Sequence, residues 1–386
     1  MMNEKDSTLA SKSDSDAGST GGTLAPQRAK RTCARAATLR AAVAAWIAAV
    51  LASTVVVDDV LAAECRMFQV GELPVRLAHN KLIVDGEING QKIGVALDTG
   101  TTRTFLLRSS AERLGLRRDR VRGLRMFGIG GETNVESGFV KEFKIGQASR
   151  TGWRMLVEGE HPFLGDTDVF LGDDFFNTID IEFDLAHRSV RLFQPKDCEG
   201  VSLAYWAPDA ASQVEIEPVD PARPQIVLTV RIDGKPVRAL LDSGAAISLL
   251  DKPAAMRLGV TPATSGVARV GRTMGLGTKP VEYWVGPFKS FAISDETIKD
   301  PLIVFGDVFK YASYTATGSY VPRRIPGTAA MLLGADFLIS HRVLVAHSQR
   351  KIYFTYSGGT LFQRMVQASS VGAGFEAGGK TATPER

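Results

Sequence analysis

The sequence predicts a mainly β protein with two tandem, barrel-like halves that carry short helices and are related by a pseudo-two-fold repeat. The first observation is a repeated phrase, in which ALDTG at residues 96–100 returns as LLDSG at residues 240–244. Strand-like runs separated by turn residues surround both copies, whereas helical patterns are few. The repeat of about 145 residues places Asp98 and Asp242 at equivalent positions.

The strands that lead to each aspartate are predicted to form a hairpin. Nine residues before the aspartate stands Asn89-Gly90 in the first copy and Asp233-Gly234 in the second. Both dipeptides suit a two-residue type I′ turn, because that turn needs a positive φ at both central positions.

A short helix is predicted after each phrase. Gly115 and Gly259, seventeen residues after the aspartates, stand near the ends of AERLGL and AAMRLGV, where glycine is typical of a helix C-terminus. Ser110 and Asp251 are suited to the N-cap positions of these helices.

Each copy later contains an apolar run that ends in glycine, at Gly172 in VFLGDDFF and at Gly334 in MLLGADFL. The acids Asp173 and Asp174 suit a helix N-terminus better than a metal site. The second copy has 18 more residues before this glycine, and we place them around residues 313–327. A strand–turn–strand pattern follows each run.

The chain outside the repeats has a different composition. An uncharged segment at residues 41–57 follows a cluster of basic residues and precedes small residues, as in a secretory signal peptide. A signal anchor that stays in the inner membrane fits equally well, because 17 residues is the lower limit for a span. The predicted order is a disordered region (1–36), the signal or anchor (37–63), domain 1 (66–198), a linker (199–224), domain 2 (225–360) and a disordered tail (361–386).

Composition excludes some classes of function. The net charge of +4 over 386 residues does not indicate a nucleic-acid partner. The five histidines show no metal-binding spacing, so no metal is implied. In an exported chain, Cys65 and Cys198 could close the first domain as a disulfide, and the alternative is two unrelated thiols.

The repeated aspartates suggest acid–base chemistry. A buried strand that ends in aspartate carries a carboxylate into the core, and the following glycine allows a tight turn. The hydroxyl of Thr99 or Ser243 can hydrogen-bond to a neighbouring loop. Two buried carboxyls that meet can share one proton, so that one is a general base and the other a general acid. The alternative is that both aspartates only cap turns.

These motifs resemble the retropepsin-like aspartic protease superfamily, in particular its exported bacterial members. The resemblance covers both repeats and rests on the two aspartate phrases, the Leu-Gly helix ends and the later apolar-apolar-Gly runs. In that family each half-barrel supplies one aspartate and water is the nucleophile, so no cofactor is needed. The resemblance implies Asp98 and Asp242 as the catalytic pair, supported by Thr99, Gly100, Ser243 and Gly244.

The family also has flap hairpins that close over the substrate. FGIGGET at residues 127–133 is similar to such a flap, and GLGTKPVEY at residues 275–283 would be the second, although it is less glycine-rich. The predicted flap residues are Gly128, Ile129, Gly130, Gly131, Gly275 and Gly277.

The resemblance implies an aspartic endopeptidase that acts on protein or peptide substrates in the periplasm or outside the cell. A membrane attachment would use residues 41–57. We favour a monomer whose two halves supply one pair of aspartates, and a homodimer with like-paired aspartates is the alternative. A second hypothesis is a peptide-binding or scaffold module of the cell envelope that keeps the fold without catalysis.

Overall fold

The computed structural model describes residues 64–159, 166–218, 225–273, 277, 279–311, 314–315, 323–324, 328–359 and 361–362. The predictions for residues 1–36 and 37–63, and for the tail beyond residue 362, lie outside this part of the chain. Strands dominate it and form three large sheets, whereas its helices have one or two turns. The prediction of a mainly β fold is confirmed.

The first half folds as an eight-stranded sheet with the order β2-β3-β4-β9-β5-β8-β7-β6, and an additional β3–β7 pairing curls it. The helix α2 (Arg108–Arg113) follows β5, and α3 (Asp173–Phe176) follows β9. The strands are β2 (Arg76–Ala78), β3 (Lys81–Ile88), β4 (Gln91–Leu97), β5 (Phe105–Leu107), β6 (Arg118–Gly128), β7 (Gly131–Ile145), β8 (Ala148–Glu158) and β9 (Val169–Leu171).

The second half repeats this design as a nine-stranded sheet with the order β16-β17-β20-β15-β23-β14-β13-β18-β19. The helices α4 (Lys252–Arg257) and α5 (Ala335–Ser340) stand where α2 and α3 stand in the first half. The strands are β13 (Val227–Ile232), β14 (Lys235–Leu241), β15 (Leu249–Asp251), β16 (Ala268–Thr273), β17 (Val281–Pro287), β18 (Ser290–Ile293), β19 (Glu296–Lys299), β20 (Leu302–Gly306) and β23 (Met331–Leu333).

The local predictions for turns and added residues are borne out. Asn89 and Gly90 have φ of 52° and 78°, and Asp233 and Gly234 have φ of 51° and 74°, so both hairpins turn through two left-handed residues. Between β20 and β23 the second half carries a small hairpin of β21 (Tyr314–Thr315) and β22 (Arg323–Arg324) that the first half lacks.

One helix-start prediction is wrong. The helix α2 begins two residues before Ser110, with Leu107 at its N-cap, so Ser110 lies inside the helix. Its hydroxyl instead donates to Asp168 Oδ1 at 2.6 Å. In the second half Asp251 is the N-cap residue of α4, although its side chain makes no capping hydrogen bond.

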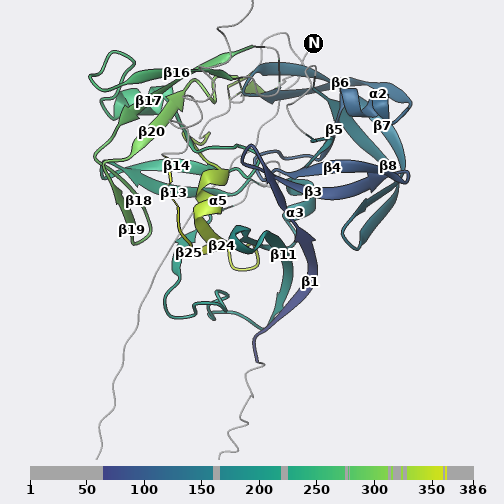
Figure 1. Ribbon diagram of the computed structural model, residues 1–386, viewed down its shortest axis with the longest axis horizontal. Helices are drawn as coiled ribbons and strands as arrows, with labels where there is room; N and C mark the ends of the chain where they lie inside the picture. Colours follow the sequence, from purple (N-terminus) through teal and green to yellow (C-terminus); the bar gives the residue numbers. More distant parts are fainter. Residues whose placement is uncertain are drawn as a thin grey trace, which may run out of the picture. The chain divides into compact units, whose positions relative to one another are not determined.

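A third sheet takes strands from both halves, in the order β1-β11-β10-β24-β25-β12 (Figure 1). The two halves meet where β10 runs antiparallel to β24, with Ile181 opposite Val345. The sequence pattern did not predict this shared sheet. Its strands are β1 (Arg66–Pro74), β10 (Asp180–Asp184), β11 (Ser189–Lys196), β12 (Ser212–Glu215), β24 (His341–Ala346) and β25 (Lys351–Tyr356), and the short helix η1 (Leu185–His187) joins β10 to β11.

The shared sheet is held by a disulfide and by buried charges. Cys65 and Cys198 form a disulfide with a Cα–Cα distance of 4.4 Å, next to the paired strands β1 and β11. The Glu182 carboxylate on β10 is fully buried, and it accepts hydrogen bonds from Arg191 on the same half and from Arg342 on the other. An ion network therefore crosses the β10–β24 junction and links the halves that carry the two aspartates.

Candidate functional site

Each repeated aspartate stands at the end of a buried strand. The strand β4 ends at Leu97 and runs parallel to β9, and the Asp98 N–H donates to the Leu171 carbonyl at 2.9 Å. In the second half β14 runs parallel to β23, and the Asp242 N–H donates to the Leu333 carbonyl at 2.9 Å. The same backbone geometry thus fixes both carboxylates.

The carboxyl groups of Asp98 and Asp242 lie side by side within one chain and hydrogen-bond to one another. Gly100 and Gly244 permit this approach. A Cβ atom on Gly100 would overlap the Asp242 carboxyl group, and one on Gly244 would overlap the Asp98 carboxyl group. Glycine is therefore required for steric reasons at the third position of both phrases.

Backbone N–H groups orient each carboxylate. Asp98 Oδ1 accepts hydrogen bonds from the N–H groups of Gly100 and Thr101 at 3.0 and 3.1 Å. In the second half Asp242 Oδ1 accepts hydrogen bonds from the N–H groups of Gly244 and Ala245 at 2.9 and 3.0 Å. The two halves therefore orient their carboxylates with the same pair of backbone donors.

The hydroxyls of Thr99 and Ser243 lock the two phrases together. Thr99 Oγ1 donates to the Leu241 carbonyl at 2.8 Å and accepts the Ser243 N–H at 3.0 Å. Ser243 Oγ donates to the Leu97 carbonyl at 2.8 Å and accepts the Thr99 N–H at 3.0 Å. Both side chains are fully buried, so these four hydrogen bonds hold the carboxyls in register.

Replacing Thr99 with valine is expected to lower the free energy of unfolding by about 2–4 kcal/mol, because it leaves the Leu241 carbonyl and the Ser243 N–H buried without partners. Urea unfolding of Thr99→Val beside Thr99→Ser measures the effect. The serine variant keeps the hydroxyl and should lose about 1 kcal/mol with the methyl group. Equal stability of the two variants would show that the hydroxyl does not brace the site.

The electrostatics of the pair favour one shared proton. Burial raises the pKa of Asp98 well above its ordinary value, and the charge of Asp242 raises it further. Burial also raises the pKa of Asp242, against the lowering effect of its backbone N–H donors. Two adjacent carboxyls do not both ionise readily, so the pair titrates as a unit that keeps one proton over a wide pH range.

Among the described residues, Lys81 of the first half is a cation that interacts with the pair. Lys81, at the start of β3, is partly buried, and its Nζ atom lies 5.6 Å from the centroid of the Phe170 ring. Burial lowers the pKa of Lys81, and the Asp98 carboxylate acts in the opposite direction. Gln225 occupies the equivalent position of the second half and donates to the Gly100 carbonyl at 3.0 Å, so the charge is not repeated.

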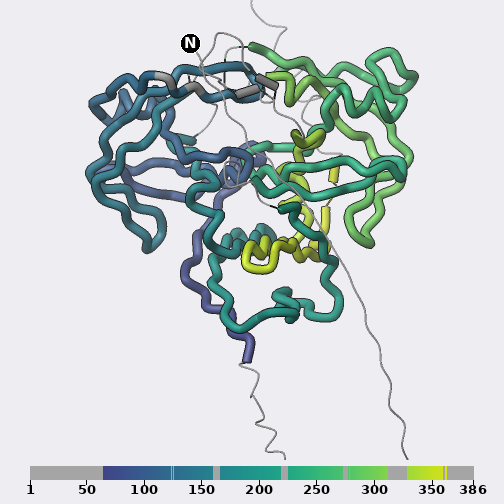
Figure 2. The backbone as a smooth tube through the Cα atoms, turned by 180° about the vertical axis from the view of Figure 1, so that it is seen from behind, coloured from purple at the N-terminus to yellow at the C-terminus, as the bar shows by residue number. Residues whose placement is uncertain are grey.

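The two predicted flaps are hairpins whose tips touch. The β6–β7 hairpin closes with Gly128 opposite Gly131, and Gly130 at its tip forms a bridge with Gly277 of the β16–β17 hairpin. Figure 2 shows the two hairpins approaching one another from the blue and the green halves. A Cβ atom on Gly277 would overlap the Gly130 backbone, so the contact requires glycine. Gly275 lies outside the described residues.

Apolar side chains flank the region of the aspartates in both halves. One buried cluster in the first half includes Phe105 and Phe170, and one in the second half includes Leu249 and Leu332. Ile129, at the tip of the first flap, packs against the cluster of the second half. The first flap therefore reaches across the boundary between the halves.

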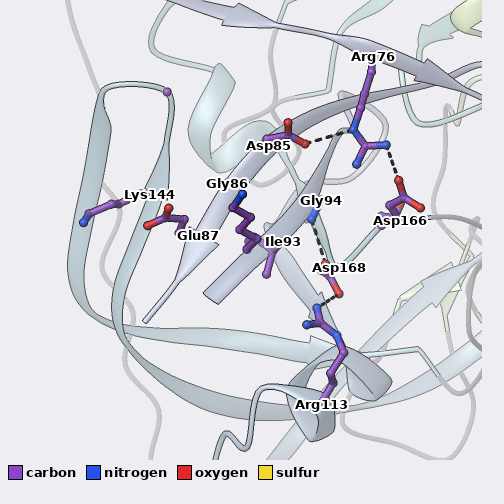
Figure 3. A pocket seen from close by; sticks show the side chains of 13 residues that line it. Arg76, Asp85, Gly86, Glu87, Ile93, Gly94, Arg113, Lys144, Asp166 and Asp168 are labelled. Carbon is purple, nitrogen blue, oxygen red and sulfur yellow. Dashed lines mark hydrogen bonds and ion pairs between the residues drawn. The ribbon is translucent and has the colours of Figure 1, made fainter. Parts of the chain in front are cut away.

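A cavity of about 940 Å³ lies elsewhere, and neither Asp98 nor Asp242 lines it. Figure 3 shows how its charges pair within the wall. The Arg76 guanidinium contacts the carboxylates of Asp85 and Asp166, at 3.2 and 2.6 Å, and the Arg113 guanidinium contacts Asp168 at 2.6 Å. Because these charges pair with one another, the cavity shows no clear preference for a charged ligand. The cavity is not part of the site around Asp98 and Asp242.

The described residues contain no group of three or more His, Cys, Asp or Glu side chains placed to hold a metal ion. The same residues include no helix with the length and apolar character needed to span a bilayer. The apolar segment at residues 41–57 is outside them.

Comparison with protein families gives one match, to the aspartyl protease model, at residues 84–175 and 228–337. The two regions together cover just over half of the chain. The chain belongs to the aspartyl protease family. Among curated proteins the search found no match.

The two family matches coincide with the two half-barrels. Each begins in the first strand of the Asn-Gly or Asp-Gly hairpin, and each ends in the short helix after the apolar-apolar-Gly run, α3 or α5. The prediction of two tandem retropepsin-like half-barrels is confirmed at this level. The strands of the shared sheet lie outside the matched regions. The strand–turn–strand pattern after each apolar run predicted four of them, β10, β11, β24 and β25, but not that they pair across the two halves.

The structure brings the predicted site residues together, and their catalytic roles stay a prediction. Sequence reasoning missed two residues in this neighbourhood, Lys81 and Asp173. Asp173 does begin the helix α3, as its position in the sequence suggested, but it is fully buried. The contrast between LGDD in the first copy and LGAD in the second was the available signal, since the second copy has Ala335 at this position.

Proposed function

We propose that this member of the aspartyl protease family is an endopeptidase that hydrolyses peptide bonds with a water molecule activated by Asp98 and Asp242. The observation that carries the proposal is the pair of adjacent carboxyls, oriented by backbone N–H groups and locked by Thr99 and Ser243. A module that only binds peptides has no need for two costly carboxyls in contact.

The reaction follows from the shared proton. The ionised carboxylate takes a proton from water, and the oxygen of that water attacks the peptide carbonyl carbon. The protonated carboxyl gives its proton to the carbonyl oxygen, which produces a neutral tetrahedral diol. This intermediate collapses as the C–N bond breaks: the nitrogen takes up the proton that the first carboxyl had accepted from water, and one diol hydroxyl returns its proton to the second carboxylate. One carboxyl ends the cycle protonated and the other ionised, so the pair is ready for another water.

The flap contact at Gly130 and Gly277 supports an extended peptide as the substrate. A peptide strand lying between the aspartates and the flap tips would find backbone groups for hydrogen bonds and the two apolar clusters for its side chains. Because one chain supplies both aspartates and both flaps, we propose that the monomer is sufficient for activity.

We propose that the chain acts in the periplasm or outside the cell, with membrane attachment through residues 41–57 if this segment is retained. The Cys65–Cys198 disulfide supports export, because such bonds persist in oxidising compartments. Alkylation of the unreduced protein recovered from cells should leave both cysteines unlabelled. Efficient labelling of both would contradict export.

The proposal is tested by incubating the purified chain with a mixed peptide library and reading the products by mass spectrometry. Endopeptidase activity predicts new internal termini at a reproducible set of sites, at a protein mass in solution equal to one chain. Recovery of intact peptides bound to the protein would instead support the scaffold hypothesis. Cleavage found only in a dimeric fraction would support the homodimer.

A further inference from the structure

Asp173, the first residue of α3, is a buried acid that the proposed reaction does not use. Its side chain has no exposure to solvent, and neither of its carboxylate oxygens has a hydrogen-bond partner among the described residues. Burying a carboxyl without a partner is costly, so such a residue is uncommon unless it has a role.

Asp173 is linked to the aspartate pair through one residue, Thr101. The Asp173 N–H donates to the Thr101 carbonyl at 2.9 Å, and the N–H of the same Thr101 donates to Asp98 Oδ1 at 3.1 Å. Burial raises the pKa of Asp173 to about 9, with further contributions from the charges of Asp98, Asp242 and Asp174. Asp173 is therefore a neutral carboxylic acid at neutral pH, beside a pair that carries one negative charge.

The second half shows that the fold does not need this acid. Ala335 stands at the equivalent position at the start of α5 and is also fully buried. Its N–H donates to the Ala245 carbonyl at 2.8 Å, and the Ala245 N–H donates to Asp242 Oδ1 at 3.0 Å. The backbone connection is the same in both halves, so the Asp173 carboxyl is an addition to the first half.

The neighbouring acid has the structural role instead. Asp174 accepts hydrogen bonds from the N–H and the hydroxyl of Thr104, at 2.8 and 2.6 Å. Its equivalent Asp336 accepts one from the Ser248 hydroxyl at 2.7 Å. Both halves therefore keep a partnered acid at the second position of the helix, and only the first half has the unpartnered one.

We propose that Asp173 is a positioning residue for the Asp98–Asp242 pair, a third carboxyl that shares in the proton equilibrium of the pair and keeps it singly protonated to higher pH. The proposal rests on the proposed function, because its main consequence is the pH range of hydrolysis.

The physical basis is the reciprocity of coupled sites. The negative charges of Asp98 and Asp242 disfavour ionisation of Asp173, so an ionised Asp173 must disfavour loss of the last proton from the pair by the same free energy. The other charged groups near Asp173 do not replace it. Asp174 is held by its hydrogen bond from Thr104, and the Arg103 side chain in the adjoining loop is exposed to solvent. Lys81 interacts with Asp98 and favours the ionised form of that aspartate.

The test is the pH profile of kcat/KM for the wild type, Asp173→Ala and Asp173→Asn. Both variants remove the third titrating group. Because Asp173 acts on the pair only where it is itself ionised, the basic limb near and above pH 9 should move to lower pH by up to about half a unit, a threefold change in proton affinity. The acidic limb and KM should stay unchanged, because Asp173 is protonated there in the wild type. The matched control is Glu158→Gln, another buried acid with no hydrogen-bond partner in the described part of the chain, whose pKa is raised by burial. Its profile should match that of the wild type.

A second measurement separates this proposal from the proposed function. The carboxyl carbons of 13C-labelled aspartate can be titrated by NMR without substrate, in the wild type and in both variants. A lower midpoint for Asp98 and Asp242 in the variants supports the proposal even if no peptide is cleaved. Unchanged midpoints overturn it even if the protease is active. Should Asp173→Ala fail to fold, the isosteric Asp173→Asn gives the same two outcomes.

Discussion

Replacing Asp98 with asparagine is expected to reduce peptide hydrolysis by about a thousandfold or more, and Asp242→Asn should have the same effect. Asparagine has the same shape as aspartate, and its amide oxygen can accept the hydrogen bonds of Gly100 and Thr101. It can neither ionise nor pass on a proton. Either substitution therefore removes the general base or the general acid and leaves the fold in place, as circular dichroism and unfolding should show.

A matched control is Asp85→Asn, because Asp85 is exposed and its ion pair in the described part of the chain is with Arg76 of the first half. This variant should keep full activity. If Asp98→Asn or Asp242→Asn also kept full activity, the pairing within one chain would be wrong. A homodimer with like-paired aspartates predicts a different result, since each single variant would then keep one of the two sites.

The elements that could be predicted from sequence are those set by residues close together in the chain. Asn89-Gly90 and Asp233-Gly234 define their hairpins because few other dipeptides adopt two left-handed conformations in succession. Gly115 ends its helix in the left-handed conformation for a similar local reason. The residues of the candidate site could be predicted for the same local reason, because the strand, the aspartate and the glycine of each phrase are consecutive in the sequence.

The features that could not be predicted depend on pairs of residues far apart. The junction of β10 and β24 joins Ile181 to Val345, and no local pattern specifies which strand becomes the neighbour of another. The N-cap prediction for Ser110 was wrong, because the Ser110 hydroxyl hydrogen-bonds to Asp168, which is distant in sequence. Similarly, the repeat shows that position 173 differs from position 335, but only the packed structure shows that the acid is buried.

The stability of the protein is expected to fall as pH rises from neutral to mildly alkaline. Burial raises the pKa of Asp173 to about 9 and that of Glu158 to about 8, and neither carboxyl has a hydrogen-bond partner in the part of the chain described. Below about pH 3 both acids are protonated in the folded and unfolded states, so their burial does not change the pH dependence of stability there. At higher pH the two carboxyls ionise in the unfolded chain but keep their protons in the folded chain, so folding becomes less favourable.

The slope of this loss can be bounded. Each retained proton lowers the free energy of unfolding by about 1.4 kcal/mol per pH unit, so the two acids together account for at most about 3 kcal/mol per unit up to pH 8. His347 opposes them at lower pH, because burial lowers its pKa to about 4 and it must stay neutral to fold. Its contribution ends near its ordinary pKa of 6.5. Burial also raises the pKa of Asp251 to about 6, which adds to the loss of stability only below about pH 6, so neither group contributes between about pH 6.5 and 8.

Urea unfolding of the wild type, Asp173→Ala and Glu158→Leu at pH 5 and pH 8 tests this account. The repeat indicates that Asp173→Ala fits the fold, because the second half has Ala335 at the equivalent position. Glu158→Leu replaces a buried acid with an apolar side chain of similar size. Each variant should gain stability over the wild type at pH 8, by about 1 kcal/mol or more, and gain little at pH 5. The control is Asp174→Ala, because Asp174 has hydrogen-bond partners. This substitution removes the acceptor for the Thr104 N–H and hydroxyl, so it should destabilise the protein at both pH 5 and pH 8. A wild type whose stability is flat or rising from pH 6.5 to 8 would contradict this account, because it would mean that the folded chain does not retain the protons of the two acids.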